Sequence, residues 1–507
     1  MKQQSEYLFE LIKSLNGPEK RYFTLYLRRH FKDGNISLSL FQTLQNQSIY
    51  NEDAAVKATA VSRNHFAVQK TILYKQLLQA LIQYNADSDV LQRLQQEVFA
   101  AKLLLQKGLT HQAKVKVRQI KADAAQYEQH EIALQAIQLE SVIAAREQFR
   151  NVSAEDIQGH YAETGQRTDD ILAESAYRFA YNSAQKIQLQ AGGKSDAKAK
   201  EVKALLKTIN TRQAKKPLTR KALMDKMQTE ALYHFMNRDT AKAFDINTEF
   251  IAMMEADSAL IPLYPQRYFA ALNNYLIDCF NLSRTEAFQT TLAKMRELKD
   301  NPAFKKLSNL EVNIFRITYQ AELNYLISEG EFTKALAAVK DVKERLQKYG
   351  DSIPVHHRMN LEYLSAYMLF GAGKYEAASA ILDSVQQYSR AETAAAPDVM
   401  TAVMQVICHY EMKSYSIIDS LVKSCKRKLN NHKEMLSEGI FELLNAINGF
   451  AVKLPTENDW KKLSARLESA DSKTDAAYSN YFEYRVYVSA QARRIPYEVA
   501  WRSEKDR

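Results

Sequence analysis

The sequence predicts an all-α protein, an α-solenoid of about eight stacked helical hairpins that follow an N-terminal helical module. Glycine and proline number only 13 and 9 among 507 residues, whereas an average chain carries roughly 12% of the two together. Apolar residues recur with a helical period, and a hairpin motif returns after about 43 residues. Because glycine and proline mark turns between strands, a chain so poor in both is not a β-sandwich, a barrel or a doubly wound sheet.

The composition is that of a protein that buries a core. Hydrophobic residues make up 46% and charged residues 25%, far from the composition of a disordered chain. The cysteines Cys279, Cys408 and Cys425 are widely separated, so we expect neither a disulfide framework nor a cysteine metal site. No window approaches the roughly 18 to 20 apolar residues of a membrane span, and the chain start lacks a secretory signal. We therefore expect a cytoplasmic protein without a membrane span.

Residues 1–90 are predicted to form the N-terminal helical module. A helical stripe from Tyr7 to Leu15 stops at Asn16-Gly17-Pro18, and Glu19 opens a second helix. Further helices are expected over 38–47, 52–61 and 68–84. The pair around 61–64 has helix-turn-helix spacing, but apolar side chains stand where a recognition helix needs base-reading groups: Ile72, Leu73, Leu77 and Leu78. A capping module is therefore the favoured interpretation, and DNA binding the alternative.

The hairpin motif is clearest at 330–335 and 373–378, which both read G-x-[YF]-x-x-A. The glycine allows the first helix to end in a left-handed turn, and the aromatic residue fills the corner. The alanine lets the second helix approach the first closely. Weaker copies begin at 108, 238, 282 and 413, and turn-like residues at 150–153 and 191–194 mark two more positions. The helical-repeat solenoid is expected to span 91–450.

These residues resemble the second half of the tetratricopeptide-repeat motif, and the resemblance covers roughly 95 to 450. It implies a right-handed superhelix whose concave face binds peptides or other proteins. The chain departs from that motif, because Tyr319 and Glu362 hold the first-helix tryptophan position and Leu323 and Ala366 the small-residue position. No ligand-binding residue of the family is carried over. The segment 15–23 is also similar to the opening of large helical-repeat proteins of Bacteroidota bacteria, which suggests a bacterial lineage.

Residues 451–507 are predicted to cap the solenoid. Pro455-Thr456-Glu457 carries helix-start chemistry, and Trp460, Leu463 and Leu467 form the expected buried stripe. The last helix is expected near 474–494 and is rich in aromatic residues.

One segment, 186–226, accounts for almost all of the net charge of +10, because it holds twelve basic and three acidic residues. Val202, Leu205, Leu206 and Ile209 form an apolar stripe within it, which leaves lysines on the other faces. Clustered lysines would favour nucleic acid or an acidic protein surface. A solvated helix and loop is the other interpretation, favoured because little aromatic interleaving is present to stack bases. The candidate basic binding patch comprises Lys198, Lys200, Lys203, Lys207, Arg212, Lys215, Lys216, Arg220 and Lys221.

Catalytic, cofactor and metal motifs are incomplete. Gly193-Lys194-Ser195 lacks the first glycine of a phosphate-binding loop, and Tyr375 replaces the hydroxyl that would follow Gly373-Lys374. His130-Glu131 lacks the second histidine of a zinc-protease helix. Adjacent His356 and His357 are expected to project in different directions, and the pairs Glu155-Asp156 and Asp169-Asp170 to be helix caps or solvated charge.

The sequence thus favours a non-enzymatic scaffold or adaptor that binds a protein or peptide along the concave face, without cofactor or metal. The alternative is a nucleic-acid or ribosome-associated protein that uses the 186–226 segment.

Overall fold

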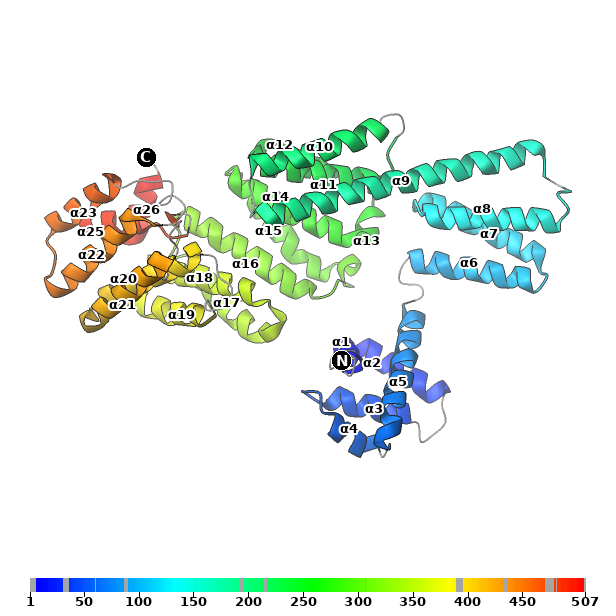
Figure 1. The fold of residues 1–507 in the computed structure, drawn as a ribbon, viewed down its shortest axis with the longest axis horizontal. Coiled ribbons are helices and arrows are strands. Elements are labelled where there is room, and N and C mark those ends of the chain that lie inside the picture. Colours follow the sequence, from blue (N-terminus) through cyan, green and yellow to red (C-terminus); the bar gives the residue numbers. More distant parts are fainter. Residues whose placement is uncertain are drawn as a thin grey trace. The chain divides into compact units, whose positions relative to one another are not determined.

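The computed structural model describes residues 6–30, 36–59, 61–85, 90–150, 152–191, 195–213, 217–305, 307–388, 395–431, 436–469, 478–479 and 481–505. These residues form helices and their connections, with no strand among them, so the predicted all-α class is confirmed (Figure 1). The chain divides into two compact units. Unit 1 comprises 1–186 and 202–226, and unit 2 comprises 187–201 and 227–507.

Eleven of the described helices lie before residue 237: α1 (Tyr7–Ser14), α2 (Gly17–His30), α3 (Ile36–Asn46), α4 (Glu52–Thr59), α5 (Arg63–Tyr84), α6 (Val90–Gln106), α7 (Thr110–Gln126), α8 (His130–Arg146), α9 (Ala154–Ala191), α10 (Asp196–Gln213) and α11 (Arg220–Met236). The division between the units falls within α9, α10 and α11.

The remaining helices all belong to unit 2: α12 (Thr240–Ala256), α13 (Leu260–Leu263), α14 (Pro265–Asn281), α15 (Thr285–Glu297), η2 (Leu298–Asp300), η3 (Pro302–Phe304), α16 (Leu310–Ser328), α17 (Leu336–Tyr349), η4 (Gly350–Ser352), α18 (Val355–Gly371), α19 (Tyr375–Tyr388), α20 (Ala395–Glu411), α21 (Tyr415–Asn431), α22 (Glu438–Val452), α23 (Glu457–Ser469), α25 (Tyr484–Arg493) and α26 (Tyr497–Lys505).

Helices α1 to α5 share a hydrophobic core, to which Phe23, Phe41 and Phe66 contribute fully buried rings. The predicted break after α1 is present, and Asn16 begins α2 with a reciprocal cap. The Glu19 amide donates to Asn16 Oδ1 at 2.9 Å, and the Asn16 amide donates to Glu19 Oε2 at 2.8 Å. On α5, Leu73 and Leu77 are buried, whereas Ile72 and Leu78 remain exposed.

The six predicted hairpin corners that begin at 108, 238, 282, 330, 373 and 413 fall between helices. Gly108, Gly330 and Gly373 have φ values of 77°, 66° and 71°, which a residue with a Cβ adopts rarely. Arg238, Ser283 and Lys413 occupy the same left-handed region at the weaker copies. Each helix end is closed by the same pair of backbone bonds. At the Gly330 corner, the amides of Gly330 and Glu331 donate to the carbonyls of Ile327 and Leu326.

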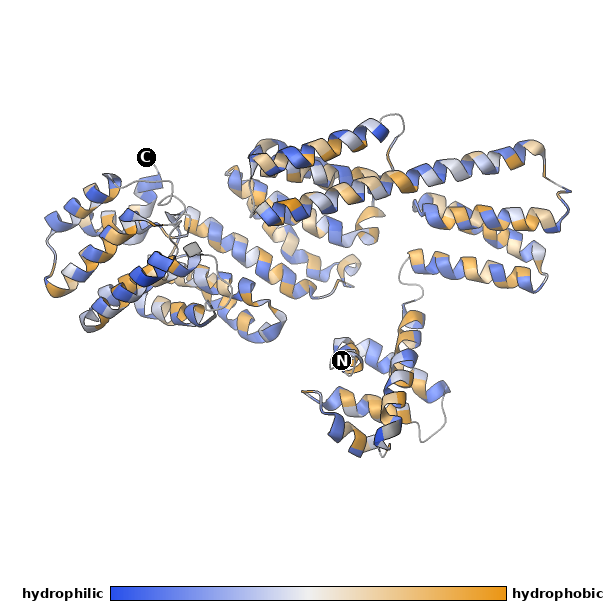
Figure 2. Cartoon of the chain, in the orientation of Figure 1, coloured by the Kyte–Doolittle hydropathy of each residue, from blue (hydrophilic) through white to orange (hydrophobic). Residues whose placement is uncertain are grey.

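Most helices of the hairpins carry one apolar and one polar face (Figure 2). In unit 2 each helix packs against its successor, and α16 also packs against both α14 and α18. The corner ring of Phe332 is fully buried against Gly371 at the end of α18, where an added Cβ would overlap the ring. Neighbouring hairpins are thus in close contact through the residues that define the repeated motif.

Between the two predicted corners at 150–153 and 191–194 the structure has one helix, where a hairpin repeat implies two. Helix α9 runs uninterrupted for 38 residues from Ala154 to Ala191, and residues 192–194 of the second predicted corner lie outside the described residues. No proline and no glycine occur between Gly165 and the end of α9, so nothing in the sequence stops the helix there.

The C-terminal prediction is confirmed for α23 and only in part for the final helix. Trp460, Leu463 and Leu467 are buried as expected. Of the helix predicted near 474–494, residues 484–493 form α25, 481–483 are not helical, and 474–477 and 480 lie outside the described residues. The chain adds α26 after a left-handed Arg494 and Pro496. Helix α26 returns to the end of α16, where Arg502 Nε donates to the Gly330 carbonyl at 3.1 Å. Lys505 pairs with Glu329 at 2.6 Å, which places two cations at the negative end of the α16 dipole.

Candidate interaction groove and basic segment

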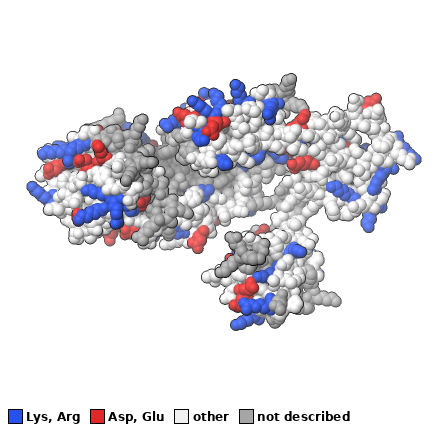
Figure 3. Space-filling model, viewed as in Figure 1, with Lys and Arg blue, Asp and Glu red and all other residues white. Residues whose placement is uncertain are grey.

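Helix α10 carries the first part of the basic segment. Its predicted apolar stripe is confirmed, because Val202, Leu206 and Ile209 are buried and Leu205 packs beside them. Lys200, Lys207 and Arg212 are exposed, and none of them forms an ion pair with a described residue. Lys203 is exposed as well. Lysine and arginine atoms lie next to acidic atoms in the area where Figure 1 places α10 (Figure 3).

Other members of the predicted patch are engaged or not described. Lys198 pairs with Glu201 at 2.7 Å. Lys215 and Lys216 lie outside the described residues. The remaining two, Arg220 and Lys221, contact carboxylates of unit 1. The structure therefore does not gather the nine predicted residues into one free basic surface.

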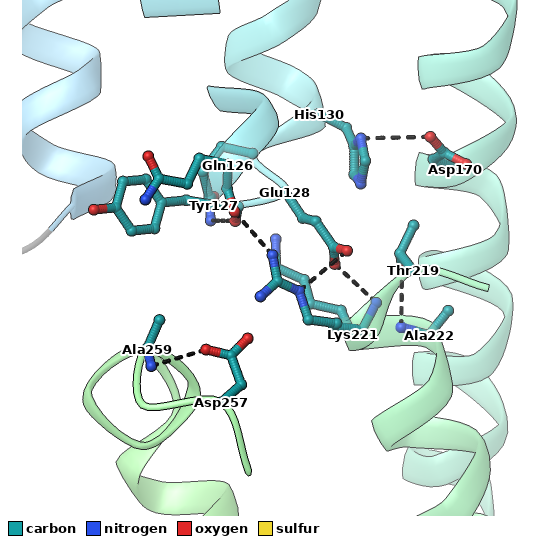
Figure 4. A network of polar contacts seen from close by, with 12 residues as sticks. Gln126, Tyr127, Glu128, His130, Asp170, Thr219, Lys221, Ala222, Asp257 and Ala259 are labelled. Atoms are coloured by element: carbon teal, nitrogen blue, oxygen red, sulfur yellow. Dashed lines mark hydrogen bonds and ion pairs between the residues drawn. The ribbon is translucent and has the colours of Figure 1, made fainter. Parts of the chain in front are cut away.

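Arg220 and Lys221 belong to a polar network that joins α8, α9 and the start of α11 (Figure 4). The Arg220 amide donates to Glu128 Oε2 at 2.8 Å, and its guanidinium lies 3.2 Å from Glu128 Oε1. Thr219 Oγ1 donates to Glu174 Oε1 at 2.9 Å, and Lys221 Nζ lies 3.7 Å from the same carboxylate. Both cations thus neutralise partly buried acids within the fold.

The centre of this network is His130, which is 5% exposed. Its Nδ1 lies 3.5 Å from Asp170, and its Nε2 lies 3.5 Å from Glu174. Burial lowers the pKa of the His130 imidazole, although the two neighbouring carboxylates act in the opposite direction and raise it. Burial also raises the pKa of Glu174. The prediction of solvated charge is wrong for Asp170, because α9 packs it beside His130. It is right for Asp156, which forms a reciprocal cap with Ser153.

A cavity of about 830 Å³ lies in unit 2 between the end of α16 and helices α23, α25 and α26. Trp501 supplies an aromatic wall, and the cavity rim carries both signs of charge. Several rim groups are already engaged: Arg493 donates to Ser503, Ser489 donates to Glu504, and Lys505 pairs with Glu329. The charge at this cavity is therefore largely balanced within the fold.

A second hollow, of about 300 Å³, lies along α14, α16 and the start of α18. We call this hollow the 316 groove. Its apolar part is formed by Leu276 and Phe288, which are buried, together with Ile277 and Phe280, which are 42% and 36% exposed. Its polar part is formed by Asn273, Gln320, Asn324, Arg316 and His357.

The helical period explains why these polar groups meet. Arg316, Gln320 and Asn324 recur every four residues on α16 and therefore share one face. Asn324 Nδ2 donates to the Gln320 carbonyl at 2.8 Å. The side-chain amides of Asn273 and Gln320 form no hydrogen bond with a described residue. Two amide side chains are thus uncommitted at the polar end of the 316 groove.

Arg316 is held by uncharged neighbours. Its Nε donates to Asn313 Oδ1 at 3.0 Å, and its Nη1 lies 2.7 Å from His357 Nε2. Burial lowers the pKa of the guanidinium, and within the described part of the chain no carboxylate lies at ion-pair distance from it. Arg296, Arg345 and Arg502 in the same unit each pair with a carboxylate. Arg316 therefore keeps its full positive charge in a partly desolvated position.

His357 supports this charge in its neutral form. Burial, the Arg316 charge and the neighbouring His356 lower the pKa of His357 to about 4. Its Nε2 can therefore accept the hydrogen bond from Arg316 near neutral pH. The prediction that His356 and His357 project apart is wrong, because their ring centroids lie 4.0 Å apart.

Sequence reasoning did not find the 316 groove. The signal that points to it is the i, i+4, i+8 row of Arg316, Gln320 and Asn324, placed on the first helix of a hairpin. That row reads as an ordinary polar helix face until α14 and α18 are known to pack on either side of α16.

No family model, curated protein or solved structure matches the chain. The described helices include none with both the length and the apolar character needed to cross a membrane. In the same residues, no three His, Cys, Asp or Glu side chains are grouped so that they could hold a metal ion. All three cysteines are free and buried.

Proposed function

We propose that the protein is a non-enzymatic scaffold or adaptor that binds a protein or peptide along the concave face of a tetratricopeptide-like α-solenoid. The observation that carries this proposal is the 316 groove. It is built from successive first helices of hairpins, and it offers apolar surface beside uncommitted amides and a cation. When helical hairpins stack, their first helices form one layer and their second helices another, and the shared core lies between the layers. The outer side of the layer of first helices is then left as an extended groove.

Selection from a phage library of random heptapeptides on the immobilised full-length chain tests this function. Ala321 lines the 316 groove and is half-buried, so Ala321→Trp should fill the groove with a large side chain. The selected peptides should lose binding to this variant and keep binding to Ala337→Trp, at an exposed position of α17 outside the groove. A failure to select any peptide that Ala321→Trp blocks would refute the proposed function.

The second candidate function is binding to RNA through the basic segment. The observation that favours it is the set of exposed cations on α10 that have no acidic partner among the described residues, namely Lys200, Lys207 and Arg212. Replacing all three with glutamine should weaken retention of generic single-stranded RNA. It should also make the slope of log K against log salt shallower by about 2, since each phosphate contact contributes about 0.7.

Glutamine at Lys203, Lys207, Lys215 and Lys216 should likewise leave folding intact and abolish RNA retention. If retention persists at an unchanged salt slope, the basic segment does not bind RNA.

A further inference from the structure

We infer that the exposed face of α9 binds α9 of a second copy of this chain, with the two helices antiparallel, so that unit 1 mediates self-association. The surface comprises nine residues at alternating spacings of three and four, all of them exposed: Gln158, Tyr161, Gly165, Thr168, Leu172, Ser175, Phe179, Asn182 and Lys186. We call this surface the α9 stripe. It lies wholly within unit 1 and shares no residue with the 316 groove, so the inference does not depend on the proposed function.

The distribution of charge on α9 (Figure 1) is the reverse of that on an ordinary surface helix. A surface helix of a globular protein normally turns charged residues to solvent and apolar residues to the core. On α9 the charged side chains face neighbouring helices. Glu163 lies 2.9 Å from Lys121 on α7, and Asp170 lies 3.5 Å from His130 on α8. The α9 stripe, on the opposite face, holds no charged residue before its last position, so it is suited to contact with protein rather than with water.

Three large side chains give the α9 stripe its apolar surface. Tyr161, Leu172 and Phe179 are 81%, 58% and 61% exposed. Their spacing is that of a helix-pairing seam, because alternating steps of three and four residues keep side chains on the face that meets another helix. Apolar side chains gathered in one exposed row, rather than scattered singly, mark an interaction site. The regular seam makes a second helix the partner that fits this face.

The order of residues makes the α9 stripe complementary to itself when it is reversed. In an antiparallel pair centred at position 170, large side chains meet large ones and small side chains meet small ones. The opposed pairs are Tyr161 with Phe179, Gly165 with Ser175, and Thr168 with Leu172 of the second copy. A two-fold axis forms each contact twice, as in other isologous dimers. The small pairs allow the two backbones to approach between the aromatic pairs.

Charges at the ends of the α9 stripe favour the antiparallel orientation. That orientation brings Lys186, near the end of α9, beside Glu155 of the second copy, near its start, and both residues are exposed. A parallel pair would set Lys186 against its own counterpart, and such like-charge contacts are costly. Asp169 does approach its own counterpart in the antiparallel pair. It lies at the exposed flank of the seam, where salt and solvent screen the repulsion.

The available area sets the expected affinity. From Glu155 to Lys186 the helix is about 47 Å long and about 10 Å wide, so the contact covers roughly 500 Å² of each copy. A total of about 1,000 Å² is at the lower end of specific protein interfaces. We therefore expect a reversible dimer with a dissociation constant in the micromolar range.

Sedimentation velocity of the full-length chain between about 1 and 100 µM measures this equilibrium. The wild type should shift from monomer to dimer within that range. Phe179→Glu places an unpaired charge in the seam and should weaken the dimer by at least about 10-fold. Phe99 on α6 provides the matched control, because it belongs to the same unit and is 62% exposed. Phe99→Glu should leave the dissociation constant unchanged.

A second variant keeps the test valid if Phe179→Glu perturbs the fold. A Cβ added at Gly165 meets no atom within 4 Å, and leucine is a better helix former than glycine. Gly165→Leu should therefore leave the melting temperature of the monomer unchanged or raise it. In the antiparallel pair the larger side chain holds the two helices apart, so the dimer should weaken by about 10-fold.

Cysteine crosslinking determines the orientation. The variants Gly165→Cys and Ser175→Cys are prepared separately, and the three native cysteines are buried and do not compete. A mixture of the two variants should form a disulfide-linked dimer. Each variant alone should not, because identical positions lie about 15 Å apart in the antiparallel pair.

Two sedimentation results would overturn the inference: a wild-type chain that stays monomeric at 100 µM, or a dimer that both Phe179→Glu and Gly165→Leu leave intact. Efficient crosslinking of Ser175→Cys alone would also overturn it, because that result identifies parallel helices.

Discussion

The contact between Phe332 and Gly371 allows a quantitative test of how neighbouring hairpins pack. Phe332 is fully buried, and its ring lies 5.8 Å from Tyr367, 5.4 Å from Tyr497 and 5.8 Å from Trp501, measured between ring centroids. Truncation by Phe332→Ala should lower the free energy of unfolding of this core by about 3–5 kcal/mol, as for other buried aromatic residues. The loss combines removed apolar contact with the cavity that remains.

Gly371→Ala perturbs the same contact from the opposite side. The added methyl group would overlap the Phe332 ring, and such overpacking costs about 1–3 kcal/mol. The better helix propensity of alanine offsets at most about 1 kcal/mol of this cost. In the Phe332→Ala background the methyl group enters vacated space instead. The double variant should therefore be more stable than the sum of the single effects predicts, with a coupling energy of about 1–3 kcal/mol.

Tryptophan fluorescence reports on this part of the molecule specifically. The chain has 2 tryptophans, Trp460 and Trp501, and both pack in the hydrophobic core that contains Phe332. Urea unfolding of the wild type, the two single variants and the double variant, followed by this signal, yields the coupling energy. Additive effects within about 0.5 kcal/mol would show that the two residues do not touch, and would refute the packing described here.

Three further outcomes are expected. Burial raises the pKa of Asp225 to about 7, so the folded state holds this proton more tightly than the unfolded state, whose value is 3.8. The stability that this proton contributes should decline as the pH rises from about 4 to about 7, and Asp225→Asn should flatten the pH dependence of the urea midpoint measured by circular dichroism; identical profiles would contradict this. Asn16→Ala removes the cap of α2 and should cost about 1 kcal/mol, whereas the exposed control Asn46→Ala should cost little; equal melting temperatures would argue against the cap. Arg220→Gln should lower stability by about 1 kcal/mol through the loss of Glu128 pairing and leave RNA retention unchanged, and a reduced salt slope would instead place Arg220 at a binding surface.

The sequence was sufficient to predict local structure wherever a residue type has one dominant backbone role. Gly330 and Gly373 were placed correctly at left-handed corners because few other residues adopt that conformation readily. The cap at Thr456 and the buried stripe of Trp460 followed from equally local chemistry. Residues without such a role were harder to place. The length of helix α9 was not predicted, because the motif copies mark hairpin corners and no residue between them indicates whether the helix stops or continues.

The 316 groove could not be predicted because its components come from three helices. In the sequence Arg316 resembles any exposed arginine. Its role depends on its neighbours in the fold, which are the uncharged Asn313 and His357. His357 was expected to project away from the adjacent His356 and had no predicted partner, yet α18 places its Nε2 against Arg316. Conversely, Arg220 and Lys221 looked available in a basic segment, but α11 places them beside Glu128 and Glu174. A sequence gives the number and positions of charged side chains, whereas only the fold shows which of them form ion pairs with one another.

Site-specific photocrosslinking tests the central claim most directly. A benzoylphenylalanine at Gln320, within the 316 groove, is compared with one at Lys340, on exposed α17 outside it. Peptides selected on the full-length chain should crosslink at position 320 and not at position 340, and the crosslink at 320 should disappear in the Ala321→Trp background. Crosslinking at position 340 alone, or equally at both positions, would contradict the assignment of this groove as the binding surface.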